Sequence, residues 1–173
     1  MISEAMQKAM NDQINAELYS AYLYLSMAAY FESISLGGFS NWMRCQALEE
    51  ETHAIKFFDH ICGRGGRVAL QPIEGVPTEW ESALAVFQAV YGHEQKVTAL
   101  INGLVKIARE ENDNAAINFL QWFVDEQVEE EKSADDVVQS LTLIGGAGHG
   151  VLMIDRELAA RTFVMPTATA AGA

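Results

Sequence analysis

Apolar residues recur at intervals of three and four along most of the chain, the spacing of a helix with one buried face. No Gly or Pro interrupts this pattern from Ser3 to about Phe31, so we expect one long amphipathic helix there. A turn signal at residues 35–38 follows, and the same periodicity resumes from about Phe39 to Gly63. The two segments predict a pair of long antiparallel helices.

Residues 64–77 lack helical periodicity. Their two prolines, Pro72 and Pro77, exclude a long helix, and the segment is long enough to carry the chain along the whole bundle. We expect a third helix to open at Thr78, which has capping-box spacing to Glu81, and to end near residue 108. A break at residues 112–114 offers N-cap residues for a fourth helix that runs to about residue 143.

The glycine-rich residues 145–148 stop the fourth helix, and apolar residues from Val151 to Leu158 predict a short fifth helix ending near Arg161. A helix beyond a complete bundle lacks a surface of its own subunit to bury against, so we expect it to contact other copies of the chain. The alternative is a helix folded back on its own bundle. We predict an all-α fold over residues 1–161, with a flexible tail at residues 162–173.

Composition narrows the possible partners. At 173 residues and 50% hydrophobic content the chain fits one domain. A formal charge of −13 with only 11 Lys and Arg argues against a nucleic-acid partner and favours cations. Only two cysteines, no leader pattern and no apolar run of roughly 20 residues predict a cytoplasmic protein that does not span a membrane.

Each of the four long helices carries a glutamate on a largely apolar face. Glu94 lies in the middle of a core stripe, and Glu17, Glu50 and Glu130 have similar neighbours. His53 follows Glu49 by four residues and Glu50 by three, so either carboxylate can share a helical face with the imidazole. The pattern predicts one cluster of acids inside the bundle.

Buried carboxylates that face one another repel and lose hydration, and a multivalent cation removes both penalties. Oxygen ligands with one imidazole, and room for two ions, suit iron or manganese, with zinc as a non-native occupant. Two alternatives compete with a metal site. The acids could be solvated charges, or they could form a buried hydrogen-bond network, for which the chain lacks the arginines.

Several segments resemble the ferritins, most closely the non-haem ferritins of bacteria and archaea. Those segments are Gln13-Ile14-Asn15-Ala16-Glu17, residues 22–28, Gly38-Phe39-Ser40-Asn41-Trp42-Met43, and residues 118–123 continuing to 126–131. The resemblance implies a ferritin-like four-helix bundle with a long crossover between the second and third helices and a short fifth helix. It also implies a hollow homo-oligomer of twenty-four subunits, in which the fifth helices meet at four-fold axes.

The resemblance also assigns roles at a di-iron ferroxidase centre. Glu17, Glu50 and His53 would bind one iron, and Glu50 would bridge to a second iron held by Glu94 and Glu130. Two further residues would assist these ligands. Gln127 would lie beside them or help to bind oxygen, and Tyr24 would donate a hydrogen bond to a ligand and supply an electron.

A third iron site of prokaryotic ferritins would use Glu49, Glu126 and Glu129 together with Glu130. The implied function is iron storage: Fe(II) is oxidised by O2 or H2O2, and ferric oxyhydroxide is deposited inside the shell. Alternatives are a peroxide-scavenging or substrate-oxidising di-iron protein, for which an electron-donor module with paired cysteines is missing, a purely structural shell, and a DNA-protecting mini-ferritin.

Three departures from related families bear on this assignment. The fourth helix offers Gln127 and Glu130 where bacterioferritin, rubrerythrin and di-iron oxygenases have a second ligand histidine. Glu51 stands where bacterioferritin has its haem-binding methionine, so we expect no haem. Ile117 and Leu120 stand where animal ferritins have acids lining a three-fold channel. The resemblance therefore does not identify the route by which iron enters.

Overall fold

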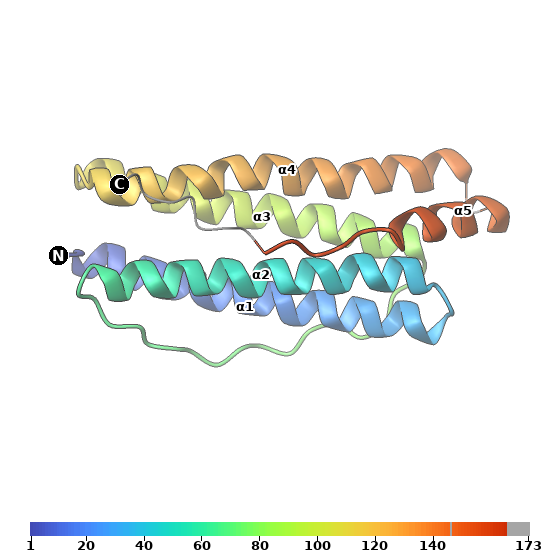
Figure 1. The fold of residues 1–173 in the computed structure, drawn as a ribbon, viewed down its shortest axis with the longest axis horizontal. Coiled ribbons are helices and arrows are strands. Elements are labelled where there is room, and N and C mark those ends of the chain that lie inside the picture. The colour runs from blue at the N-terminus through green and yellow to red at the C-terminus, as the bar shows by residue number, and fades with distance from the viewer. Residues whose placement is uncertain (146, 166–173) are drawn as a thin grey trace.

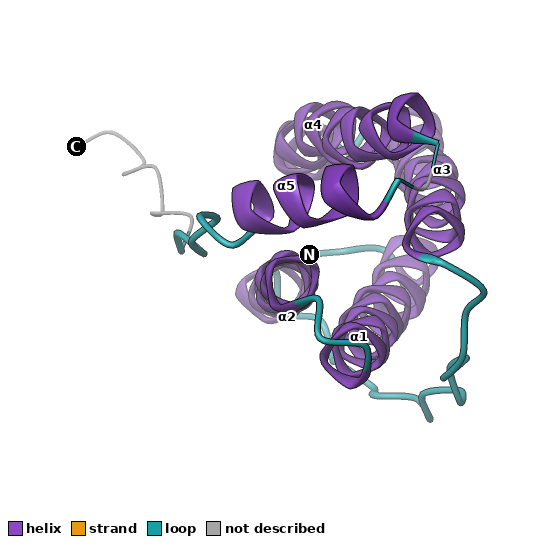
Figure 2. Ribbon diagram, turned by 90° about the vertical axis from the view of Figure 1, so that its right-hand side faces the viewer, coloured by secondary structure: helices purple, strands orange, loops and turns teal. Residues whose placement is uncertain are grey.

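The computed structural model describes residues 1–145 and 147–165, and these residues form five helices and no strand. The helices are α1 (Glu4–Ser33), α2 (Gly37–Gly63), α3 (Ala83–Glu110), α4 (Asn114–Ile144) and α5 (Gly148–Leu158). The first four lie side by side as a bundle, and α5 lies across one end of it (Figures 1 and 2). The predicted all-α fold is therefore confirmed. Residues 166–173 of the predicted tail lie outside the described residues.

Side-chain caps set the starts of three long helices. Ser3 Oγ accepts a hydrogen bond of 3.0 Å from the Met6 N–H at the predicted start of α1, and Asp113 caps α4 in the same way. The predicted start of the third helix was wrong. Ser82 Oγ accepts the N–H of Ala85 at 3.1 Å, so α3 begins at Ala83 and Thr78 lies before it.

The irregular segment between α2 and α3 runs the length of the bundle beside α1 (Figure 1). Polar side chains of α1 hold it there. Asn11 exchanges hydrogen bonds with the backbone at Arg67 and Ala69, and Ser26 Oγ donates to the Pro77 carbonyl at 2.6 Å. Because this crossover returns the chain to the end where α2 starts, α2 and α3 run in the same direction, as predicted.

The fifth helix packs on its own bundle, so the expectation that it has nothing to bury against in its own subunit was wrong. Val151, Ile154 and Leu158 pack against the core, and α5 ends at Leu158 rather than near Arg161. Asp155 Oδ1 accepts the N–H groups of Gly38 and Phe39 at 2.8 and 3.0 Å, which caps α2 from a distant helix.

Gly38 is required for this close approach of α5 to α2. A Cβ atom at Gly38 would lie 1.6 Å from the carbonyl oxygen of Asp155, so any other residue would force α5 away. Leu152 and Met153 on α5 remain exposed to solvent, at 52% and 73%. The helix therefore covers the end of its own bundle and still presents apolar side chains outward.

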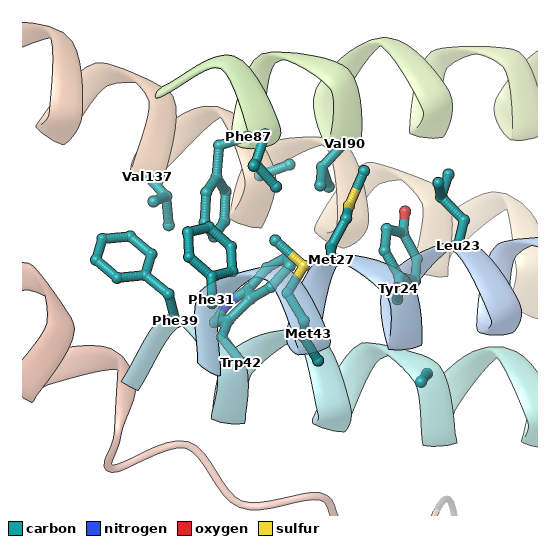
Figure 3. Packing of buried hydrophobic residues seen from close by; sticks show 14 of the residues in the cluster. Leu23, Tyr24, Met27, Phe31, Phe39, Trp42, Met43, Phe87, Val90 and Val137 are labelled. Atoms are coloured by element: carbon teal, nitrogen blue, oxygen red, sulfur yellow. The ribbon is translucent and has the colours of Figure 1, made fainter. Parts of the chain in front are cut away.

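The hydrophobic core consists of two separate clusters. One includes Tyr24, Phe31, Phe87 and Val90 and lies toward the α5 end (Figure 3). The other, which includes Phe57 and Phe123, is formed by the opposite halves of the same four helices. A layer of polar side chains separates the two clusters.

No helix within the described residues combines the length and the apolar content that a membrane span requires.

Candidate metal centre

The polar layer contains one or two side chains from each long helix. Its position follows from the sequence, because on every helix these residues fall between the apolar positions of one cluster and those of the other. None of these side chains is more than 5% exposed. The layer comprises Glu17 of α1, Glu50 and His53 of α2, Glu94 of α3, and Gln127 and Glu130 of α4.

On the α1 and α2 side of the layer, three ligand-type groups converge. One oxygen each of Glu17 and Glu50 and one ring nitrogen of His53 lie within 4.8 Å of one another. Glu50 Oε2 is 3.5 Å from His53 Nδ1, and neither it nor Glu17 Oε2 has a hydrogen-bond partner among the residues that the structure describes. Buried carboxylate oxygens without donors are costly, so this arrangement favours a bound cation.

On the opposite side, Glu94 is held by two hydrogen bonds from side chains. Tyr24 Oη donates to Oε1, and Gln127 Nε2 lies 3.3 Å from Oε2. Tyr24 and Gln127 therefore both contact a predicted ligand. Tyr24 also belongs to the first hydrophobic cluster, where Figure 3 shows its ring beside Leu23 and Met27.

Two glutamines that the pattern of buried acids does not predict also belong to this site. Gln13 Nε2 donates to Glu17 Oε1 at 3.0 Å, and Gln46 Nε2 donates to Glu130 Oε2 at 2.7 Å. Both amides are buried. A signal for them existed, because Gln13 and Gln46 each precede a layer glutamate, Glu17 and Glu50, by four residues on the same helical face. One amide donor thus orients each of Glu17, Glu94 and Glu130.

Burial raises the pKa of every carboxyl group in the layer. The shift is large for Glu17 and Glu50, where the neighbouring carboxylates add to it, and the pKa of Glu130 rises to about 8. Burial likewise raises the pKa of Glu94, although the hydrogen bonds from Tyr24 and Gln127 oppose the change. Without a cation the layer therefore holds protons at neutral pH, and a cation would replace them.

The donor set fits divalent or trivalent metal ions. Four carboxylates supply hard oxygen ligands and His53 supplies one nitrogen, a combination that suits iron or manganese. A second grouping shares His53: one ligand atom each of His53, Glu126 and Glu130 lies within 4.8 Å of the others. No Lys or Arg is among the buried residues of the described ranges, so no basic side chain neutralises the layer.

The family model of the ferritin-like domain matches residues 7–144, which include every residue of this layer. The chain belongs to the ferritin family. A bacterial non-heme ferritin of Bacteroides fragilis is 45% identical over 161 residues, covering 93% of this chain and 100% of the relative. One from Staphylococcus aureus is 38% identical over 163 residues, 94% and 98% of the two chains.

Solved structures of another ferritin agree with this assignment. The open-pore ferritin of the archaeon Archaeoglobus fulgidus superposes with a TM-score of 0.93 at 57% identity, covering 94% of this chain and 100% of that one. A form of the same protein engineered to be closed gives a TM-score of 0.93 at 57% identity, with coverage of 95% and 100%. The helices that carry the polar layer therefore have the arrangement of known ferritins.

The acids predicted for a third iron site of this ferritin occupy different environments. Glu130 is buried, Glu126 is partly buried and grouped with His53, and Glu129 is exposed. Glu49 is partly buried and forms an ion pair of 2.5 Å with Arg161. No sequence pattern indicates this ion pair, because its two members lie more than a hundred residues apart.

Proposed function

We propose that this ferritin oxidises Fe(II) in the polar layer and stores the ferric product inside a shell of identical subunits. The observation that carries the proposal is the pair of buried, unpartnered oxygens, Glu17 Oε2 and Glu50 Oε2, next to His53. Such oxygens are stabilised by a cation, and family membership makes iron the relevant one.

Each residue of the layer has a proposed role. Glu17, Glu50 and His53 hold one Fe(II), and Glu50 also contacts a second Fe(II) held by Glu94 and Glu130. The residues that contact these ligands, and the acids of the third site, also have proposed roles. Tyr24 and Gln127 orient Glu94, with Tyr24 available as an electron donor, and Glu126, Glu129 and Glu49 join Glu130 in binding a third iron.

The chemistry follows from the charge of the layer. Anionic oxygen ligands stabilise Fe(III) more than Fe(II), so they lower the reduction potential and favour loss of an electron. Two Fe(II) ions each give one electron to O2, which takes up two protons and becomes H2O2. When H2O2 is the oxidant, it takes two electrons and two protons and becomes two water molecules. Hydrolysis of the Fe(III) product then releases protons and yields the oxyhydroxide.

Exposed apolar side chains on the helix surfaces support assembly of several subunits. Large hydrophobic residues that are at least 44% exposed occur on all five helices; they include Tyr22, Leu25, Leu48, Ile55, Leu100, Val128 and Leu152. We propose a shell of twenty-four chains.

The formal charge of this shell would be roughly −300, because each chain carries −13. Such self-repulsion predicts that assembly depends on ionic strength, and a single unchanging species in size-exclusion chromatography across a salt series would contradict it.

Aerobic iron loading tests the proposal. The parent protein is expected to retain far more iron per chain than its binding sites can hold, whereas a peroxide-scavenging enzyme would retain only the ions in its sites. Variants Glu94→Ala and His53→Ala are expected to slow the rapid phase of Fe(II) oxidation by roughly a hundredfold while the shell still assembles. Matched controls are the exposed Glu79→Ala and His149→Ala. If both site variants oxidise Fe(II) as fast as the parent, the site assignment is wrong.

A further inference from the structure

The short segment after α5 brings Arg161 onto the face of α2. Asn41 Nδ2 donates a 2.9 Å hydrogen bond to the Arg161 carbonyl, which fixes the backbone there. The guanidinium carbon lies 4.6 Å from the centre of the Trp42 ring, so cation–π attraction holds the side chain against α2. From this position Arg161 Nη2 donates to Glu49 Oε2 at 2.5 Å.

Glu49 lies beside the acids proposed for the third iron site. Glu49 precedes His53 by four residues on α2, so the two side chains lie one helical turn apart on the same face. One ligand atom each of His53, Glu126 and Glu130 lies within 4.8 Å of the others. His53 therefore connects the helical face of Glu49 to these two acids. The guanidinium group therefore neutralises one acid at the margin of the polar layer, where an iron ion would also bind.

The arrangement leaves one group of Arg161 unsatisfied. Its second terminal nitrogen, Nη1, is buried and has no hydrogen-bond partner within residues 1–145 and 147–165. A buried donor without an acceptor makes the closed pair less stable than a bidentate one. In addition, the side chains of Arg161 and Glu49 are 23% and 19% exposed, so water can reach both groups when they separate. The pair is therefore suited to being exchanged for another cation.

We propose that Arg161 is an internal competitor of iron at the third site: its guanidinium occupies Glu49 until a metal ion displaces it. The inference rests on the proposed function, because it assumes that Glu49 joins Glu126, Glu129 and Glu130 around an ion. Arg161 thereby sets the order of filling. The inner layer, which has no basic side chain among the described buried residues, fills first, and the third site fills only at higher metal concentration.

Zinc titration followed by calorimetry tests this order, because Zn(II) binds these ligand types and is not oxidised. The assembled parent protein is expected to bind two Zn(II) per chain tightly and a third more weakly. Arg161→Gln is expected to strengthen binding of the third ion by about three- to tenfold, the loss of a partly buried ion pair, and to leave the two tight ions unchanged. Arg156→Gln removes an exposed arginine of α5 and is the matched control.

Comparing Arg161→Gln in the parent and in a Glu49→Gln variant separates competition for Glu49 from simple loss of positive charge. If Arg161 acts through Glu49, Arg161→Gln has no effect on third-ion binding when Glu49→Gln is already present. An equal gain in both backgrounds, or no gain in the single variant, overturns the proposal. Loss of the two tight ions from the parent would instead contradict the proposed function. Crystals soaked in Zn(II) give an independent readout: metal on Glu49 with the Arg161 ion pair intact would also overturn the competition.

Discussion

Gln46 Nε2 donates a 2.7 Å hydrogen bond to Glu130 Oε2, which joins α2 to α4 inside the bundle. The amide fixes the direction of a carboxylate that we propose as an iron ligand. Groups that orient metal ligands in this way typically contribute a factor of about 10–100 to metal affinity or activity. Gln46 therefore acts by positioning Glu130 and does not itself bind the metal.

Gln46→Leu is expected to weaken Zn(II) binding at the layer by roughly tenfold, because Glu130 loses the side-chain amide that donates to it. Calorimetric titration of the assembled protein measures the change. The matched control is Gln139→Leu, whose amide is exposed and contacts Asp135 on the same helix. Equal affinities for the Gln46 variant and the parent would show that the hydrogen bond does not position a ligand.

Replacing Glu50 tests whether the polar layer makes the metal-free protein less stable than an apolar side chain would. No described residue donates a hydrogen bond to Glu50 Oε2, and burial together with the neighbouring carboxylates raises the pKa of Glu50. Replacing it with methionine of similar shape removes a buried polar group that is costly to desolvate, so Glu50→Met is expected to stabilise the metal-free protein by about 1–3 kcal/mol. Urea unfolding measures this change, and Zn(II) should no longer add its full stabilisation.

The neighbouring residue supplies the control for this substitution. Glu51 is exposed, and Glu51→Met is expected to change the free energy of unfolding by less than about 0.5 kcal/mol. A Glu50→Met variant that is less stable than the metal-free parent would mean that Glu50 has favourable partners in the folded chain without metal.

The metal-free protein is expected to lose stability as pH rises. The layer carboxyl groups have raised pKa values in the folded state, about 8 for Glu130, so the folded chain binds more protons than the unfolded chain above pH 4.5. The free energy of unfolding then decreases with pH up to about 8, by an amount on the order of a few kcal/mol. Urea unfolding at pH 6 and pH 8 measures the slope.

Metal reverses this dependence, because a cation binds the deprotonated carboxylates. The Zn(II)-saturated protein is therefore expected to gain stability over the same pH range. Glu130→Gln removes one of the titrating groups and should flatten the slope of the metal-free protein. A metal-free parent that becomes more stable between pH 6 and pH 8 would contradict the assignment of protons to the layer.

Asp155 should hold the fifth helix on the bundle. Asp155→Ala removes the acceptor for the Gly38 and Phe39 N–H groups, and loss of such a cap is expected to destabilise the protein by about 1–2 kcal/mol. Hydrogen exchange should become faster in α5 and at the start of α2. Exposed Glu157→Ala on the same helix is the control, and equal exchange in both variants would show that the cap does not secure α5.

The sequence predicted the four buried glutamates because helical periodicity identifies which face is apolar, and a charge on that face stands out. Glu94 between Val90 and Val97 is the clearest example. Glutamine gives a weaker signal, since it is common on either face, and Gln46 was therefore missed. The start of α3 was misplaced because Thr78 and Ser82 are both residue types that favour an N-cap, and the structure has Ser82 in that position.

Long-range contacts were beyond sequence reasoning. The packing of α5 depends on Asp155 meeting the N–H groups at Gly38, and the state of Glu49 depends on Arg161. In both cases the two partners are more than a hundred residues apart, and the sequence around one partner does not indicate the other. Local periodicity reveals which residues are buried, whereas their partners depend on how the helices are arranged.

The most direct measurement is anomalous scattering at the iron edge from crystals soaked anaerobically in Fe(II). We expect two strong peaks per chain, one among Glu17, Glu50 and His53 and one among Glu50, Glu94 and Glu130, with a weaker third peak near Glu126. Iron confined to the protein surface, with none in the layer between the two hydrophobic clusters, would contradict the account.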